Sequence, residues 1–235
     1  MKVGIMQPYF FPYIGYFSLI EYVDRFIFFD TPQYISHGWM NRNRVLRQDG
    51  QPHYITAPIQ KSPRDTAICD IKVVSGEQWK ERIFTQLADY KKKAPYYSET
   101  IGFLREALNH TGENLAEINI RTTIATCDYL GIKADYDVFS EMKLSIEAVH
   151  APDEWALNIT KAIHGDTYVN PPGGEALFDR KKYEDAGIRL TFIKSNLPQY
   201  IQRIGRFEPA LSIIDVMMFN HPDDVRKMLR DYTLF

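Results

Sequence analysis

Residues 3–16 read VGIMQPYFFPYIGY, and this stretch decides how the fold is interpreted. Residues 3–6 form a short apolar run that Gln7 and Pro8 stop, which is typical of a buried strand followed by an irregular turn. The pattern over residues 14–23 favours a helix. A strand that turns into a helix is a building unit of α/β folds. We expect the tyrosine-rich turn over residues 7–16 to form the working surface of the protein.

Strands and helices alternate along the rest of the chain. A second strand over residues 25–30 (RFIFFD) leads into a long polar loop over residues 31–52. Over residues 77–131 the apolar residues recur mostly at helical spacing, and we interpret this segment as a helical insert. Further strands are expected at 54–59, 68–74, 136–139, 167–170 and 188–193, and further helices at 152–163, 176–185, 209–219 and 222–232. This order predicts one α/β domain over residues 1–235, with a mostly parallel sheet that helices cover.

The composition disfavours several classes of protein. Of the 235 residues, 45% are hydrophobic and 25% are charged, which is typical of a globular chain. The net charge of -2 gives no field that would attract nucleic acid. Cys69 and Cys127 form no metal-binding spacing, so we predict no metal. No signal peptide and no apolar run of roughly 18 residues is present, so we expect a soluble, cytoplasmic protein without a membrane span.

Three loops are expected at one edge of the sheet. Ligands of parallel α/β sheets bind beyond the carboxyl ends of the strands. Residues 7–16, 30–44 and 170–176 each follow a predicted strand there. We expect the first two loops to wall a single concave cavity.

The first loop offers flat rings to a ligand. Tyr9, Tyr13 and Tyr16 present faces suited to a sugar or a base. Gly15 would let the backbone approach a bound group, and Gln7 begins the turn. The alternative interpretation is a packed aromatic core without a ligand.

The second loop carries the charged and amide groups. Arginine holds phosphate or carboxylate in a bidentate manner, and asparagine offers both a donor and an acceptor. Of the NRNR segment we favour Arg42 and Asn43 as binding residues. The remaining candidates of this loop are Gln33, Tyr34, Trp39 and Asn41. The alternative is a solvated loop.

Two residues are candidates for a catalytic base. Asp30 ends an apolar strand, where it acts as a base or accepts hydrogen bonds from loop amides. His37 shares its polar loop with Trp39 and is the best placed histidine. In the third loop, Gly173 and Gly174 either present amides to an anion or form a tight turn.

One acidic residue requires a partner. Asp215 stands in the apolar run SIIDVMMF, where an unpaired charge is costly. We expect a buried hydrogen bond, with Arg42 or a tyrosine hydroxyl as its partner. The chain also lacks Walker A, GxGxxG, HExxH and GxSxG motifs, which removes the sequence support for an ATPase, a dinucleotide enzyme, a zincin or an α/β-hydrolase.

Four segments together resemble the WbqC-like protein family. They are MQPYFFPYIGYF at 6–17, FFDTPQY at 28–34, WMNRNRV at 39–45 and PQYIQRIGRFEPALSIIDVMMFN at 198–220. The resemblance covers nearly the whole chain and implies work on a nucleotide-linked amino sugar in bacterial surface-polysaccharide (O-antigen) biosynthesis, with addition of an acyl or aminoacyl group. In the last segment, Tyr200 and Gln202 are further candidates for substrate binding.

The first turn also resembles that of HIGH-type nucleotidyltransferases. YIGY at residues 13–16 stands where those enzymes carry HxGH, which implies a Rossmann-like, HIGH-nucleotidyltransferase-like sheet. Tyrosine donates a hydrogen bond but carries no positive charge, so adenylyl transfer is less well supported than the fold.

These observations lead to one hypothesis and two rivals. The leading hypothesis is an N-acyl or N-aminoacyl transferase in which Arg42 holds phosphate and Asp30 or His37 removes the proton of the attacking amine. The rivals are an ATP-dependent ligase or nucleotidyltransferase, and a non-catalytic protein that binds a sugar nucleotide. The cofactor is undefined, because the donor is an acyl or aminoacyl group, ATP, or a group delivered by a carrier protein.

Overall fold

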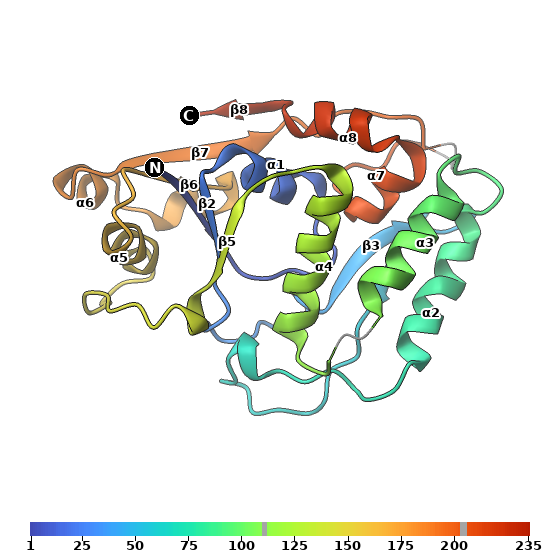
Figure 1. The fold of residues 1–235 in the computed structure, drawn as a ribbon, viewed down its shortest axis with the longest axis horizontal. Helices are drawn as coiled ribbons and strands as arrows, with labels where there is room; N and C mark the ends of the chain where they lie inside the picture. The colour runs from blue at the N-terminus through green and yellow to red at the C-terminus, as the bar shows by residue number, and fades with distance from the viewer. Residues whose placement is uncertain (110–111, 203–205) are drawn as a thin grey trace.

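A six-stranded sheet runs through the protein, here described by a computed structural model that covers residues 1–109, 112–202 and 206–235 (Figure 1). The first five strands in spatial order are parallel, and the last is antiparallel to its neighbour. In that order the strands are β5 (Asp135–Val138), β2 (Arg25–Phe28), β1 (Lys2–Met6), β6 (Thr167–Asn170), β7 (Arg189–Ser195) and β8 (Tyr232–Leu234). The prediction of a mostly parallel α/β sheet is therefore confirmed.

The strand order reverses at β1. The chain passes from β1 to β2 on one side and reaches β6 on the other side, with Gly4 paired to Phe26 in one ladder and to Val169 in the other. Loops that leave the carboxyl ends of strands at such a reversal diverge and leave a crevice for ligands. The topology thus directs attention to the loop that follows Met6.

Helices cover both faces of the sheet (Figure 1). Side chains alternate along each strand, so Phe26 and Phe28 face one core while Val3 and Ile27 face the other. The first core includes residues of α1 (Ile14–Tyr22), α4 (Leu115–Leu130), α7 (Ile213–Phe219) and α8 (Pro222–Leu229); the second includes residues of α5 (Glu154–Ala162) and α6 (Arg180–Asp185). The finer prediction of a HIGH-nucleotidyltransferase-like fold stays a prediction.

A hairpin and a group of helices pack beside the sheet. Strands β3 (Arg42–Leu46) and β4 (Pro52–Thr56) form an antiparallel pair. The segment predicted as helical contains α2 (Gln78–Leu87), α3 (Tyr97–Leu108) and α4, with the short 3-10 helix η2 (Ala88–Tyr90) between the first two. Its description as an insert within a single domain stays a prediction.

The second half of the predicted polar loop is a strand, which corrects the expectation for residues 31–52. In β3, Asn43 and Val45 point inward while Arg42 and Arg44 point outward. This alternation has the period of a strand. Of the inward residues Asn43 and Val45, only Val45 is apolar. The hydrophobic pattern alone therefore did not reveal this strand.

Several other boundaries differ from the sequence-based expectations. Residues 68–74 hold the 3-10 helix η1 (Ile68–Asp70) and isolated bridges instead of a strand. The 3-10 helix η4 (Pro172–Leu177) precedes α6, and η3 (Phe139–Glu141) follows β5. Helix α7 begins only after Ser212, whose side chain accepts from the amide of Ile214 as an N-cap. The helix predicted over residues 222–232 is observed as α8, which already ends at Leu229, and the chain continues as β8.

No helix among the described residues is both long enough and apolar enough to cross a lipid bilayer.

Candidate functional site

The loops that follow β1 and β2 lie against each other. The amide of Phe10 donates to the carbonyl oxygen of Trp39 at 2.9 Å. From β3, the side-chain amide of Asn43 donates to the carbonyl oxygens of Phe10 at 3.2 Å and Phe11 at 2.7 Å. The expected convergence of these two segments is confirmed.

A buried asparagine of α4 fixes the same junction from a third direction. The side-chain amide of Asn119 donates to the carbonyl oxygens of Pro8 at 3.0 Å and Met40 at 2.7 Å. Asn119 is fully buried, so these bonds are shielded from water. Asn119 lay outside the predicted site, because nothing in its local sequence marks it as a contact between distant loops.

A cavity of about 190 Å³ opens where the loops meet. It is lined by Tyr9, Pro12, Tyr13, Trp39, Asn43, Arg44 and Ala210, and we call it the aromatic cavity. Pockets for drug-sized ligands measure roughly 300–1,000 Å³. The aromatic cavity therefore has room for one ring and not for a whole nucleotide-linked sugar.

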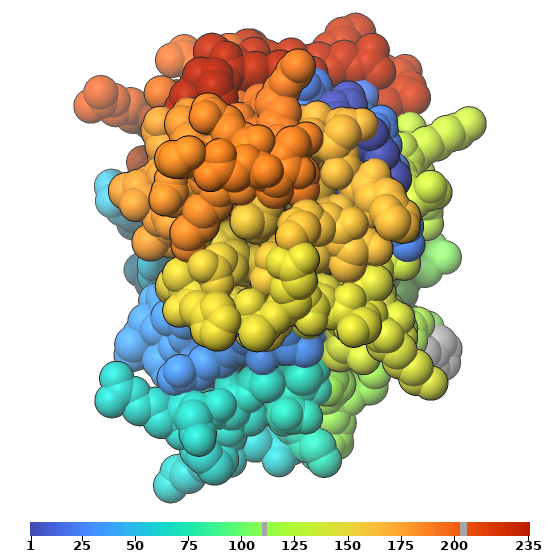
Figure 2. Space-filling view, turned by 90° about the vertical axis from the view of Figure 1, so that its left-hand side faces the viewer, coloured from blue at the N-terminus to red at the C-terminus, as the bar shows by residue number. Residues whose placement is uncertain are grey.

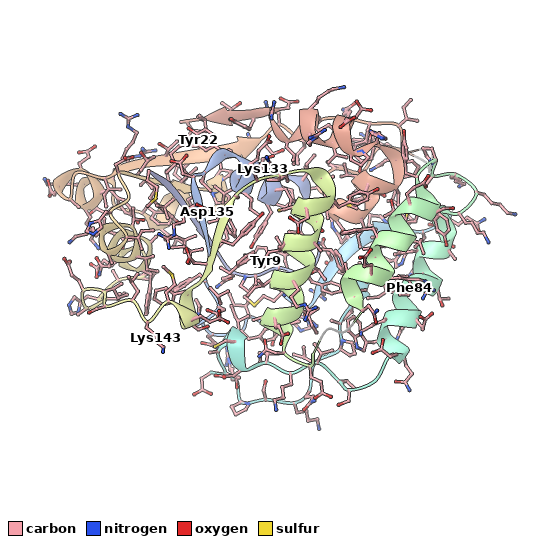
Figure 3. The ribbon with its side chains drawn as sticks, in the orientation of Figure 1. Tyr9, Tyr22, Phe84, Lys133, Asp135 and Lys143 are labelled. Atoms are coloured by element: carbon pink, nitrogen blue, oxygen red, sulfur yellow. The ribbon has the colours of Figure 1, made fainter. Side chains whose placement is uncertain are left out.

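Two of the three predicted tyrosines line this cavity, and the third does not. Tyr9 lies between the sheet and α4 (Figure 3), and Tyr13 lies at the start of α1. Burial raises the pKa of both hydroxyls, so they stay protonated and can donate hydrogen bonds. Tyr16 is only 1% exposed and donates to the backbone carbonyl oxygen of Gln7 at 3.0 Å, which supports the alternative of a packed aromatic residue for Tyr16. Gln7 is half-buried and does not line the cavity, so its role in binding stays a prediction.

Gly15 makes room for Tyr13 and not for a ligand. A β-carbon added at Gly15 would lie 2.5 Å from the ring of Tyr13, closer than atoms can pack. The ring thus lies directly over the glycine. This corrects the expectation that Gly15 itself contacts a bound group.

Arg44, not Arg42, lines the aromatic cavity. Its guanidinium pairs with Glu208 at 3.1 Å and lies 5.9 Å from the centre of the Trp39 ring. The guanidinium of Arg42 instead lies 4.3 Å from the Tyr54 ring centre and donates to the carbonyl oxygen of His37 at 2.6 Å. Both arginines project from the outer face of β3, two residues apart. Had the strand been recognised, its period of two would have made Arg44 a candidate together with Arg42.

Three of the predicted binding residues make contacts that hold the loop together. Gln33 donates to the carbonyl oxygen of Arg64 at 2.7 Å. The Tyr34 hydroxyl donates to Asn41 at 2.9 Å, and Asn41 donates in turn to the carbonyl oxygen of Ala57 at 3.0 Å. None of the three lines the aromatic cavity. Figure 2 shows the blue segment after β2 between the yellow segment before α5 and the cyan segment before η1.

The two candidate bases have different surroundings. Asp30 is 2% exposed, and its carboxylate accepts from the Ser140 hydroxyl at 2.6 Å and from the Ser140 amide at 3.1 Å. These bonds support the alternative in which Asp30 accepts hydrogen bonds, here from the segment after β5. His37 is exposed, adopts a positive φ of 64° and stands two residues before Trp39.

Gly173 and Gly174 lie in η4, and neither lines the aromatic cavity. A β-carbon at Gly174 would lie 2.6 Å from the side-chain nitrogen of Asn170, whereas nothing lies within 4 Å of one at Gly173. The tight packing of Gly174 supports the interpretation as a structural turn.

Tyr200 and Gln202 belong to a buried network around Asp215. The carboxylate of Asp215 is fully buried and accepts from the hydroxyls of Tyr90 and Tyr200, both at 2.5 Å, and from Gln202 at 3.2 Å. The expected tyrosine partner is confirmed. Burial raises the pKa of Asp215 to about 6.

This network is linked to the aromatic cavity through one carboxylate. Gln202 accepts from the amide of Glu208 at 2.8 Å, and Glu208 pairs with Arg44. Tyr200 and Gln202 therefore position the segment that carries Glu208 and Ala210, and neither lines the cavity. Residues 203–205 of the same sequence motif lie outside the described residues.

The cavity is suited to binding a ring and an anion. Its described lining contains no carboxylate, histidine or cysteine. No group of three or more histidine, cysteine, aspartate or glutamate residues in the described part of the chain could hold a metal ion. What the lining offers is aromatic faces, two tyrosine hydroxyls and one guanidinium, because the amide of Asn43 is already bound to Phe10 and Phe11.

Comparison with known proteins identifies the family. The model of the WbqC-like protein family matches residues 7–227. A Mycobacterium tuberculosis protein named "Uncharacterized protein Rv1507c" is 31% identical over 221 residues, which cover 93% of each chain. No solved structure matches the chain. The matched region contains both loops, the aromatic cavity and the Asp215 network, and the chain belongs to the WbqC-like protein family.

Proposed function

We propose that this protein transfers an acyl or aminoacyl group to the amine of a nucleotide-linked amino sugar. Membership of the WbqC-like family suggests a role in polysaccharide biosynthesis. The observation that carries the proposal is the aromatic cavity, in which Tyr9, Tyr13 and Trp39 surround a space for one ring beside Arg44. Sugars expose apolar C–H faces that stack on aromatic rings, and their hydroxyls form hydrogen bonds with tyrosine hydroxyls.

Arg44 supports an anionic substrate. A guanidinium is always charged and binds phosphate or carboxylate oxygens in a fork. Its Nε atom is buried and makes no hydrogen bond among the described residues, so it retains an unused donor. Its partner Glu208 is one-third exposed, so the ion pair is partly screened by water and can exchange for a ligand phosphate.

The chemical step requires a neutral amine. The amine nitrogen attacks the carbonyl carbon of the donor, an N–C bond forms, and the bond from that carbon to the leaving group of the donor breaks. A proton must leave the nitrogen, because an ammonium has no lone pair. We propose His37 as the proton acceptor, since it is exposed and stands two residues before Trp39, which lines the cavity. Asp30 receives no such role, because Ser140 occupies its carboxylate.

A second candidate is a binding protein without catalysis. The absence of a carboxylate or histidine from the described cavity lining favours it. Adenylyl transfer is less well supported, because Tyr16 stands where the second histidine of the HIGH motif would be and its hydroxyl is bound to Gln7 inside the core.

An assay by mass spectrometry separates these functions. The purified protein is incubated with UDP- and dTDP-linked amino sugars and one donor at a time: acetyl-CoA, a formyl donor, an acyl-carrier thioester, or an amino acid with ATP and magnesium. A mass gain on the sugar nucleotide that is lost in His37→Ala supports the proposal. Release of AMP or pyrophosphate from ATP without a modified sugar would favour adenylyl transfer. If the sugar nucleotide binds but no donor yields a product, the proposed transfer is contradicted and the binding protein without catalysis is favoured.

A further inference from the structure

A second hollow shares no lining residue with the aromatic cavity and is not used by the site described above. It has a volume of about 470 Å³ and is lined by residues of β4, of α2 and of the segment between them. Helix α2 lies on the right-hand side of Figure 1. It is lined by Tyr54, Thr56, Pro58, Val74, Ser75, Gln78, Trp79, Arg82 and Gln86, and we call it the β4–α2 hollow. Its volume falls within the range of roughly 300–1,000 Å³ for small-molecule sites.

A pair of exposed rings joins the hollow to the aromatic cavity. Trp39 lines the cavity, Tyr54 lines the hollow, and their ring centres are 6.4 Å apart. Trp39 is 42% exposed and Tyr54 is 41% exposed, which is unusual for two neighbouring aromatic residues of this size. One elongated ligand can therefore touch both hollows by crossing this pair.

The hollow favours a negatively charged ligand. The described residues that line it include no carboxylate. Its one formal charge belongs to Arg82, which is exposed and makes no hydrogen bond or ion pair to any described residue. At the border with the cavity, Arg42 lies over the Tyr54 ring and keeps its buried Nε atom without a hydrogen-bond partner. Arginines with unused donors beside aromatic rings match a ligand that combines a planar ring with an anionic group.

We propose that the β4–α2 hollow binds the nucleoside diphosphate part of a nucleotide-linked substrate whose sugar occupies the aromatic cavity. The base contacts Tyr54 and the neutral polar side chains of α2. The phosphates lie across the border between the hollows, within reach of Arg42, Arg44 and Arg82. This inference rests on the proposed function and adds where the nucleotide binds. It also explains how a cavity with room for one ring serves a larger substrate.

Calorimetric titration with UDP, GDP and dTDP tests this placement without any sugar. We expect at least one of these nucleoside diphosphates to bind the wild type. Arg82→Gln and Tyr54→Leu, both at exposed positions, should each weaken this binding about tenfold. Lys92→Gln removes the same charge from an exposed position outside the hollow and should leave the affinity within twofold. Tyr13→Ala should weaken binding of a nucleotide-linked sugar but not of the free nucleoside diphosphate.

The outcomes separate the two proposals. Failure of all three nucleoside diphosphates to bind at millimolar concentration overturns the inference, as does binding that Arg82→Gln and Tyr54→Leu leave unchanged while thermal unfolding shows both variants to be folded. Binding that depends on Arg82, combined with no product in the transfer assay, supports the inference and contradicts the proposed function. Product formation that is insensitive to both substitutions supports the proposed function and contradicts the inference.

Discussion

The buried carboxylate of Asp215 should make the stability of the protein depend on pH in an unusual direction. Asp215 is fully buried, its hydrogen-bond donors among the described residues are uncharged, and burial raises its pKa from 3.8 to about 6. In the unfolded chain its pKa returns to the ordinary value of about 3.9. Between these two values the folded protein binds more protons than the unfolded chain. The free energy of unfolding therefore falls as the pH rises from about 4 to about 6, and Asp215 adds no slope above that.

The size of the effect follows from the shift in pKa. One pKa unit corresponds to about 1.4 kcal/mol, so a shift of about two units is worth about 3 kcal/mol. Asp215→Asn keeps the shape of the side chain and one acceptor oxygen but cannot ionise. At neutral pH the substitution removes the buried charge. It also removes one hydrogen bond, either from Tyr90 or from Tyr200, and that loss costs about 1 kcal/mol.

Urea unfolding of both proteins from pH 4 to pH 7 measures this contribution. Carboxylates that the two proteins share cancel in the difference between their free energies of unfolding. We expect the stability of the wild type relative to Asp215→Asn to fall by about 2 kcal/mol across this range, because the unfolded carboxyl is already half ionised at pH 4. A difference that stays constant with pH would refute the reasoning, because it would mean that Asp215 titrates alike in the folded and unfolded states.

Three further substitutions test the contacts around the two loops. Asn43→Ala removes the buried bonds to Phe10 and Phe11 and should lower the free energy of unfolding in urea by about 2–3 kcal/mol; a loss below 0.5 kcal/mol would contradict the role of Asn43 in joining the loops. Gly15→Ala places a β-carbon against the Tyr13 ring and should cost about 1–3 kcal/mol in the same assay while also weakening calorimetric binding of a nucleotide-linked sugar; unchanged binding would show that the ring position does not matter. Asp30→Ala should destabilise the fold by about 2–3 kcal/mol but leave the affinity for the nucleotide-linked sugar within twofold. A large loss of affinity in a folded variant would show that Asp30 takes part in ligand binding.

The order of the main elements could be predicted because local patterns are strong at the first strand and helix. The apolar run at residues 3–6 and the turn at Pro8 gave β1 and the start of α1 within a residue or two. The alternation of later strands and helices gave the parallel sheet. Strand β8 was missed because it has three residues, too few for a periodic signal.

The candidate site was predicted at the level of segments and less well at the level of side chains. Sequence placed the two loops together, but it could not show that Tyr16 turns into the core while Tyr9 and Tyr13 line a cavity. The choice between Arg42 and Arg44 depended on recognising strand β3. Its inward residues are Asn43 and Val45, and a single apolar residue gives too weak a signal for a strand. The direction of a side chain in a turn depends on packing partners distant in sequence, such as Asn119 of α4.

Contacts between distant segments set the remaining features. Ala210 reaches the cavity from a segment that Gln202 and Glu208 hold against α7 and β3. The need for a partner at Asp215 was predictable from its apolar neighbours, since a lone buried charge is unstable. Which two tyrosines supply the hydroxyls was not predictable, because one of them, Tyr90, lies 125 residues away in the chain.

The central claim is that the ring of a nucleotide-linked amino sugar binds in the aromatic cavity. Trp39 in that cavity is 42% exposed, and Trp155 on α5, outside it, is 37% exposed, so the two form a matched pair. The direct test is calorimetric titration of the sugar nucleotide into the wild type, Trp39→Leu and Trp155→Leu. The account predicts that Trp39→Leu weakens binding at least about tenfold and that Trp155→Leu leaves it within twofold. Equal affinity of the wild type and a folded Trp39→Leu variant would contradict it.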